Sequence, residues 1–108
     1  MARCGDDGGY LGFGPHPDDI EIGVGGTVAK HTSQGRRVGL CDLTRGELGT
    51  NGTVETRLSE AQAGASVLGA AWHENLVWPD GEIGGADHVR AAVELVRRCQ
   101  PSTILIPY

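Results

Sequence analysis

The amino-acid sequence predicts an α/β fold in which helices cover a mostly parallel sheet. Four short apolar runs alternate along the chain with three segments whose apolar residues recur at helical spacing. Strands that alternate with helices in this way pair in parallel and are joined by right-handed crossovers. The chain has 108 residues, of which 39% are hydrophobic, so it supports one compact domain.

The apolar runs give the expected strands. We place the first over residues 10–14 and the second over 38–43, where aliphatic residues are concentrated. The third, over 72–78, is weaker and stops at the turn signal Pro79-Asp80-Gly81. The fourth covers 102–106, and the expected sheet ends with it.

Helices are expected between these strands. The first runs from 20 to 35 and ends at a glycine, which favours a helix C-terminus. The second runs from 54 to 68 after Thr53 as its cap, and the third spans 87–99 and stops before Pro101. This order of elements predicts a Rossmann-like, three-layer α/β/α architecture that is truncated after the fourth strand.

Charge and hydropathy exclude several classes of partner. The formal net charge is -5, and the interspersed charges leave no basic stripe for a nucleic-acid backbone and no polybasic patch for anionic lipid. The amino-terminal residues lack the apolar core of a signal peptide, and no window approaches the roughly 18 continuous apolar residues of a transmembrane helix. We therefore expect a cytoplasmic protein that acts on a small molecule, with no nucleic acid and no membrane as partners.

The three cysteines, Cys4, Cys41 and Cys99, are widely spaced and form no Cys-x-x-Cys pair. We expect neither a disulfide framework nor a thiolate zinc site. Cys41 and Cys99 lie in apolar segments, where a thiol behaves as a small buried hydrophobe.

Three loops, over residues 14–19, 44–53 and 79–85, follow the first three expected strands. The carboxyl ends of parallel strands lie at one edge of a sheet, and ligands collect at that edge in such folds. The sequence therefore predicts that these loops open on one functional edge.

The first loop holds the densest cluster of charged side chains, His16-Pro17-Asp18-Asp19, with Glu21 two residues further on. Carboxylates this close repel one another, and a bound cation or a shared proton is the usual compensation. His16 and Asp19 stand three residues apart at a strand-to-helix turn, so both reach one metal ion of zinc's type. Asp18, beside them, is placed to take a proton from water on the metal. Catalytic zinc usually has three protein ligands, so a third must come from elsewhere in the fold.

Other interpretations of this segment stay open. An aspartate at 18 or 19 also serves as an ordinary helix cap, and His16 as a polar loop residue. Gly23, Gly25 and Gly26 each cost roughly 1 kcal/mol relative to alanine in a helix, which indicates close approach to a neighbour or ligand. A dinucleotide site is not expected, because no Gly-x-Gly-x-x-Gly lies between strand and helix.

Residues 14–21 and 25–27 read Gly-Pro-His-Pro-Asp-Asp-Ile-Glu and Gly-Gly-Thr. They resemble the signature of the LmbE-like (PIG-L) N-acetylglucosaminyl deacetylases. Further segments resemble the branch that includes the bacillithiol-pathway deacetylases, in the family's order: 44–53, 56–57, 74–76 and 79–81. The resemblance spans nearly all of the chain but only the amino-terminal half of the family's domain. Residues 1–108 are therefore expected to be the amino-terminal part of a single LmbE-like deacetylase domain.

The resemblance implies zinc-dependent hydrolysis of the N-acetyl group of an N-acetylglucosamine derivative. It implies that His16 and Asp19 are the metal ligands and Asp18 the general base. Metal-bound water is then the nucleophile.

The same resemblance assigns three residues to the amino-sugar substrate. It implies that Arg57 binds an anionic aglycone and that Asp80 and Glu47 lie near the sugar. The ordinary alternatives for these residues are a solvated helix charge, a turn-forming aspartate and a loop charge.

The family's third metal ligand comes from a His-x-x-His segment that this sequence lacks. Three other histidines are candidates to replace it. His73 lies at the start of the third strand and should be about 16 Å from the functional edge. His31 is near the end of the first helix, at the opposite edge, whereas His88 begins the third helix on the correct side. We expect none of the three to complete the site.

The absent ligand supports a second interpretation, in which the protein is not an enzyme. The chain is then a catalytically inactive remnant or an assembly module that keeps the front half of the fold. Its fourth strand, with Ile104, Leu105 and Ile106, would be an uncovered edge that favours a homo-oligomer. Stoichiometric metal in an assembly would support a composite site, and a metal-free monomer would support the remnant.

Overall fold

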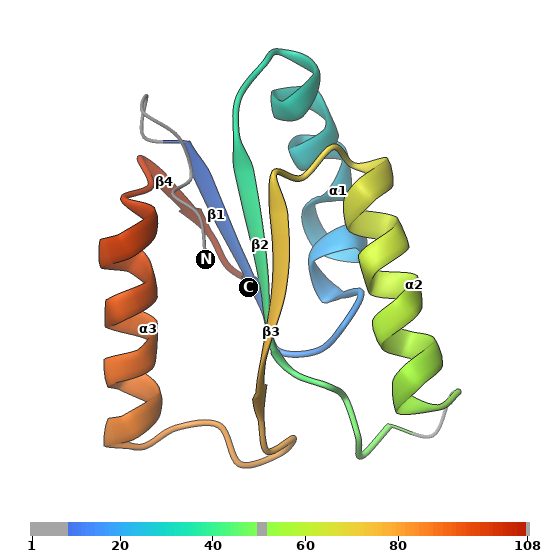
Figure 1. Ribbon diagram of the computed structural model, residues 1–108, viewed down its shortest axis with the longest axis vertical. Coiled ribbons are helices and arrows are strands. Elements are labelled where there is room, and N and C mark those ends of the chain that lie inside the picture. Colours follow the sequence, from blue (N-terminus) through green and yellow to red (C-terminus); the bar gives the residue numbers. More distant parts are fainter. Residues whose placement is uncertain (1–8, 50–51, 108) are drawn as a thin grey trace.

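The computed structural model describes residues 9–49 and 52–107. Strands and helices alternate along the chain (Figure 1). Their bounds are β1 (Tyr10–Gly14), α1 (Asp19–Ser33), β2 (Val38–Thr44), α2 (Val54–Val67), β3 (Trp72–Trp78), α3 (Ala86–Cys99) and β4 (Thr103–Leu105). Every element expected from the sequence is present, with boundaries shifted by no more than two residues.

The strands form one parallel sheet in the order β3-β2-β1-β4. Helices α1 and α2 cover one face of the sheet, and α3 covers the other (Figure 1). The three-layer α/β/α prediction is confirmed. The strand order reverses at β1, because β2 and β3 add on one side of it and β4 on the other. Loops at the carboxyl ends of strands around such a reversal form the usual ligand-binding crevice.

Alternating side chains of the sheet build a core on each face. Val38 and Leu40 of β2 pack with Val28 of α1. Cys41 points to the other face, where it packs with Leu95 of α3. All five are at most 3% exposed. Because both faces are buried, the strand reads in the sequence as a continuous apolar run.

Local signals fix the ends of two helices. Thr53 caps α2 as predicted, since its hydroxyl accepts the backbone N–H of Thr56 at 3.1 Å. Gly35 follows the end of α1 with a φ of +84°, a left-handed conformation that glycine adopts without strain.

The glycines early in α1 do not serve a close approach to a neighbouring side chain, one of the two reasons predicted for them. A Cβ atom at Gly23 or Gly26 would meet nothing within 4 Å, and one at Gly25 would meet only Leu68, at 3.9 Å. The helix is instead kinked here, because Val24 has a φ of -136° and a ψ of 19°. Glycines on both sides of Val24 give the backbone the freedom for that kink.

The cysteines differ in state. Cys41 is a buried free thiol as expected, and burial raises its pKa to about 12. Cys99 is disulfide-bonded, so the expectation that it is a plain buried thiol is wrong. Cys4 lies outside the described residues. The spacing of the cysteines did not predict the disulfide, because a fold can bring distant cysteines together without any local motif.

Strand β4 is shorter than predicted and forms an edge of the described sheet. It pairs with β1 alone among the strands at 9–49 and 52–107. Ile104 and Ile106 are 44% and 68% exposed. An edge with exposed aliphatic side chains is prone to pair with another strand.

We expect Gly39→Ala to destabilise the fold. Gly39 of β2 lies opposite Trp72 of β3, and an added Cβ atom would stand 2.2 Å from the indole ring. Forced repacking of this kind costs about 1–3 kcal/mol of unfolding free energy, which urea unfolding measures. The matched control is Gly26→Ala, which adds the same methyl group at an open position and should be neutral or stabilising by up to about 1 kcal/mol. Equal stability of the two variants would contradict this packing.

Candidate active site

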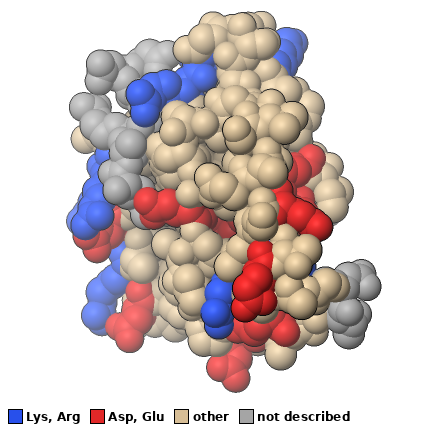
Figure 2. Space-filling view, turned by 45° about the vertical axis from the view of Figure 1, so that its right-hand side comes forward, with Lys and Arg blue, Asp and Glu red and all other residues tan. Residues whose placement is uncertain are grey.

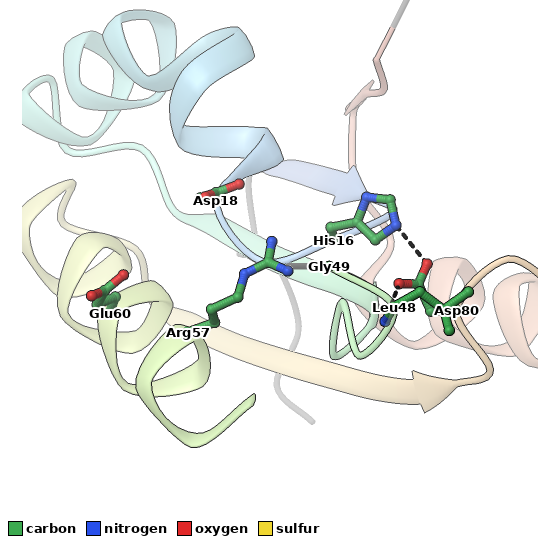
Figure 3. Close-up of a pocket in the computed structure, with 7 residues that line it drawn as sticks. All are labelled: His16, Asp18, Leu48, Gly49, Arg57, Glu60 and Asp80. Atoms are coloured by element: carbon green, nitrogen blue, oxygen red, sulfur yellow. Dashed lines mark hydrogen bonds and ion pairs between the residues drawn. The ribbon is translucent and has the colours of Figure 1, made fainter. Parts of the chain in front are cut away.

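The predicted loops meet at the carboxyl edge of the sheet around a cavity of about 580 Å³. The cavity is lined by His16, Asp18, Leu48, Gly49, Arg57, Glu60 and Asp80 (Figure 3). Four of the six site residues proposed from the sequence therefore line one cavity. The other two, Asp19 and Glu47, each accept a backbone hydrogen bond from a lining residue.

His16 lies between two carboxylates. Its Nε2 donates to Oδ1 of Asp80 at 2.7 Å, and its Nδ1 lies 3.2 Å from Oδ2 of Asp19. That same oxygen of Asp19 accepts the backbone N–H of His16 at 3.0 Å. The hydrogen bond from His16 lowers the pKa of Asp80. Oδ1 of Asp80 thus fixes the imidazole at Nε2, while Nδ1 faces Oδ2 of Asp19.

Asp18 is the N-cap residue of α1, but its side chain makes no cap hydrogen bond. Its φ of +79° is left-handed, an uncommon conformation for any residue other than glycine. The side chain is exposed to the cavity. Helix capping therefore does not explain Asp18, and such backbone strain is typical of functional sites.

His16 and Asp19 fit two positions of a zinc site. Zinc–ligand bonds of about 2.0–2.1 Å in a tetrahedron place two ligand atoms roughly 3.3 Å apart, close to the 3.2 Å between Nδ1 and Oδ2. Within residues 9–49 and 52–107, however, no group of three or more His, Cys, Asp and Glu side chains could hold a metal ion. The described residues thus offer two donors at this spacing.

Arg57 ties α2 to two of the loops. Its Nη1 donates to the carbonyl of Gly46 at 3.0 Å and its Nη2 to the carbonyl of Pro17 at 3.3 Å. The guanidinium reaches from α2 toward the loop that carries Asp18 and His16 (Figure 3). Gly46 is required here, because its φ is +67° and an added Cβ atom would lie 2.3 Å from Nη1. The half-buried Arg57 is therefore not a freely solvated helix charge.

Glu47 and Asp80 hold each other's loops. Oε2 of Glu47 accepts the backbone N–H of Asp80 at 3.0 Å, and Oδ2 of Asp80 accepts the backbone N–H of Leu48 at 3.0 Å. Each carboxylate thus satisfies a backbone donor of the other loop. Glu47 is not among the residues that line the cavity.

An irregularity at the end of β3 directs the chain toward Asp80. The pairing with β2 shifts in register near Thr44, and Val77 has a φ of +58°, which is strained for a β-branched residue. Asn75 stabilises the bend, since it donates to the carbonyl of Thr44 at 2.6 Å and accepts the N–H of Val77 at 2.8 Å.

The sequence analysis missed a buried pair beneath the site, formed by Asp42 and His73. His73 Nε2 lies 2.7 Å from Oδ2 of Asp42, and its Nδ1 lies 3.1 Å from Oε1 of Gln62. The side chains of Asp42 and His73 are 0% and 5% exposed. Oδ1 of Asp42 has no hydrogen-bond partner among the described residues. Asp42 continues the alternation of Val38 and Leu40, and this signal could have placed it on the buried face.

The imidazole of His73 holds its second proton more tightly than a free histidine does. The hydrogen bond to Asp42 raises the pKa of His73 above its usual 6.5, against the effect of burial. Burial raises the pKa of Asp42, and the hydrogen bond from His73 opposes that rise. Deprotonation would leave an uncompensated carboxylate in the interior.

None of the other histidines completes the metal site. His31 packs against the ring of Tyr10, with ring centroids 4.3 Å apart. His88 stacks on Trp78 at 4.0 Å, and its Nδ1 accepts the backbone N–H of Gly84. His73 is engaged with Asp42 in the interior.

Charges are unevenly spread on the surface. Figure 2 shows acidic side chains gathered over the lower half of the face that carries α2, at the level of the site's loops. Such a field favours a cation and disfavours a polyphosphate backbone. Among the described residues, no helix is long and apolar enough to cross a bilayer.

Comparison with known proteins agrees with this fold. The family model for GlcNAc-PI de-N-acetylases (PIG-L) matches residues 11–108. The chain therefore belongs to the PIG-L family, as the His16-Pro17-Asp18-Asp19 segment indicates.

Individual relatives differ in their activity. A diacetylchitobiose deacetylase of Thermococcus kodakarensis is 37% identical over 101 residues, which cover 86% of this chain and 38% of that protein. The conserved protein TT1542 of Thermus thermophilus is 38% identical, with a TM-score of 0.83 over 92% of this chain and 46% of that one. GalB, a 4-carboxy-2-hydroxymuconate hydratase of Pseudomonas putida KT2440, is 26% identical, with a TM-score of 0.77 over 89% and 45%. This chain thus spans less than half the length of each of these proteins.

We expect His73→Ala to destabilise the protein strongly. The variant leaves the buried carboxylate of Asp42 without its partner, which costs about 3–5 kcal/mol of unfolding free energy. Urea unfolding followed by circular dichroism measures the change. Arg90→Ala is the control, because its ion pair with Asp87 is exposed and should contribute no more than about 1 kcal/mol. A loss of similar size in both variants would show that the buried pair is unimportant.

The same pair should make stability depend on pH. The native state holds the proton of His73 more tightly than the unfolded chain does, so the stabilisation is complete below 6.5 and is lost as the pH rises through the raised pKa. Urea midpoints measured from about pH 6 to pH 9 should therefore fall with rising pH. His73→Gln should flatten this slope, and an unchanged slope in that variant would assign it to another group.

Proposed function

We propose that this site hydrolyses the N-acetyl group of an N-acetylglucosamine derivative with the help of a zinc ion. The observation that carries the proposal is the spacing of His16 Nδ1 and Asp19 Oδ2, 3.2 Å, beside the uncapped side chain of Asp18. Membership of the PIG-L family and the related deacetylase support the same chemistry. The fold by itself does not, because GalB is a hydratase.

The site residues have separate roles in this reaction. His16 and Asp19 would hold the zinc ion, which would supply a Lewis acid for the acetyl carbonyl and lower the pKa of water. Asp18 accepts the proton of the attacking water and returns it to the departing amine. Its left-handed backbone turns the carboxylate into the cavity, where no cap hydrogen bond competes for it.

Arg57 indicates the class of substrate. Two of its five N–H donors hold loop carbonyls, so the others remain for an acceptor in the cavity. A carboxylate on the aglycone would accept from such a guanidinium in a charge-assisted pair. This supports a substrate with an anionic aglycone, as in the bacillithiol-pathway branch that the sequence resembles. Asp80 and Glu60 line the same cavity and offer acceptors for sugar hydroxyls.

The incomplete ligand set requires a further donor. We propose that residues 1–108 act as the amino-terminal part of a single deacetylase domain, and that the third zinc ligand comes from a longer form or from a second copy. The exposed edge of β4 supports pairing between copies. The alternative from a different class is an inactive remnant, which would bind little or no zinc.

Asp18→Asn tests the proposed base. Asparagine keeps the shape and tolerates the left-handed backbone but cannot take up a proton. We expect near one zinc per chain in both proteins and a loss of acetate release from N-acetylglucosaminyl compounds of about 10²–10⁴-fold in the variant. Elemental analysis coupled to size exclusion, and an assay of released acetate, give the two readouts.

The matched control is Asp87→Asn, the same chemical change at a side chain that is 94% exposed. It should leave both zinc content and activity unchanged. Full activity in Asp18→Asn would remove Asp18 from the base role. A metal-free, inactive wild-type protein would instead support the remnant.

A further inference from the structure

We propose that Asp80 is a positioning residue, which selects the nitrogen of His16 that binds the metal. The inference rests on the proposed function, because it concerns the same metal site. In this proposal Asp80 orients His16 before any substrate binds, and contact with the sugar is not its only role.

The hydrogen bond to Asp80 defines the proton on His16. An ionised carboxylate only accepts hydrogen bonds, so the 2.7 Å contact between Oδ1 and Nε2 requires a hydrogen on Nε2. The neutral imidazole then has its lone pair on Nδ1. That atom faces Oδ2 of Asp19 at 3.2 Å, which is the side of the ring on which a shared metal would sit. Outer carboxylates of this kind fix the tautomer and the ring orientation of metal-binding histidines.

Asp80 is held firmly enough for this task. Its two carboxylate oxygens have different partners, Nε2 of His16 for Oδ1 and the N–H of Leu48 for Oδ2. Its backbone N–H donates to Oε2 of Glu47. The Asp80 side chain is only 8% exposed, whereas that of His16 is 39% exposed. The carboxylate therefore cannot turn to a new partner without the loss of an existing hydrogen bond.

Asp80→Asn should reverse the tautomer of the His16 imidazole, because asparagine has the shape of aspartate but can donate a hydrogen bond. The N–H of Leu48 still needs an acceptor, so the amide oxygen stays there and the amide NH₂ faces Nε2 of His16. Nε2 must then accept, and the proton moves to Nδ1, where it competes with the metal. The backbone and the loop hydrogen bond to Leu48 are kept.

The first readout is zinc affinity without substrate, measured by competition with a chromophoric chelator. We expect Asp80→Asn to weaken zinc binding by about 10–100-fold. The matched control is Glu82→Gln, which removes one carboxylate from an exposed position in the same loop and should change the affinity by less than about twofold. If Asp80 only binds sugar, Asp80→Asn will raise KM and leave zinc affinity as in the wild type, which overturns the proposal.

The second readout needs no metal. Nitrogen-15 shifts of the His16 ring in the metal-free protein at high pH should show a protonated Nε2 in the wild type and a protonated Nδ1 in Asp80→Asn. The same tautomer in both proteins would overturn the proposal. A wild type that binds no zinc but shows this tautomer switch would refute the proposed metal chemistry and leave the positioning role of Asp80 intact.

Discussion

The hydrogen bond between His16 and Asp80 is the contact on which the site depends. The two residues are 64 positions apart and follow β1 and β3, which are separated in the sheet by β2. They meet only when all three strands are parallel and in register, so that their carboxyl ends reach one edge. Without this constraint the chain would carry a histidine and several carboxylates with no common centre.

Two further contacts fix the loops around that bond. Arg57 reaches from α2 to the carbonyls of Gly46 and Pro17. Thr44, at the end of β2, donates its hydroxyl to the carbonyl of Pro15 at 2.8 Å and accepts the N–H of Gly46 at 3.0 Å. The loops are therefore ordered by their own hydrogen bonds, which hold the side chains of the cavity in place.

The interior beneath the site contains a buried polar pair. The buried Asp42 and His73 join β2 to β3, and Gln62 extends the contact to α2. Burial of such groups is costly unless they are paired, so the pair favours one arrangement of these elements over other compact packings. Burial also raises the pKa of Glu21, which adds a further protonatable group near Asp42. The face of the sheet under α2 thus contains a polar pair, whereas the core on the α3 side is apolar.

The sequence by itself determined the succession of strands and helices along the chain, the parallel direction of the strands and the cluster at His16. Periodicity, turn signals and short-range spacing, on which these predictions rest, are local properties. It could not show that Glu47 accepts the backbone N–H of Asp80, that His73 pairs with Asp42, or that Cys99 is disulfide-bonded, since these contacts join distant segments. It also did not show the kink at Val24 that the glycines of α1 accompany. Only the tertiary structure decides which side chains share a cavity, because strand order and register set distances that no local pattern encodes.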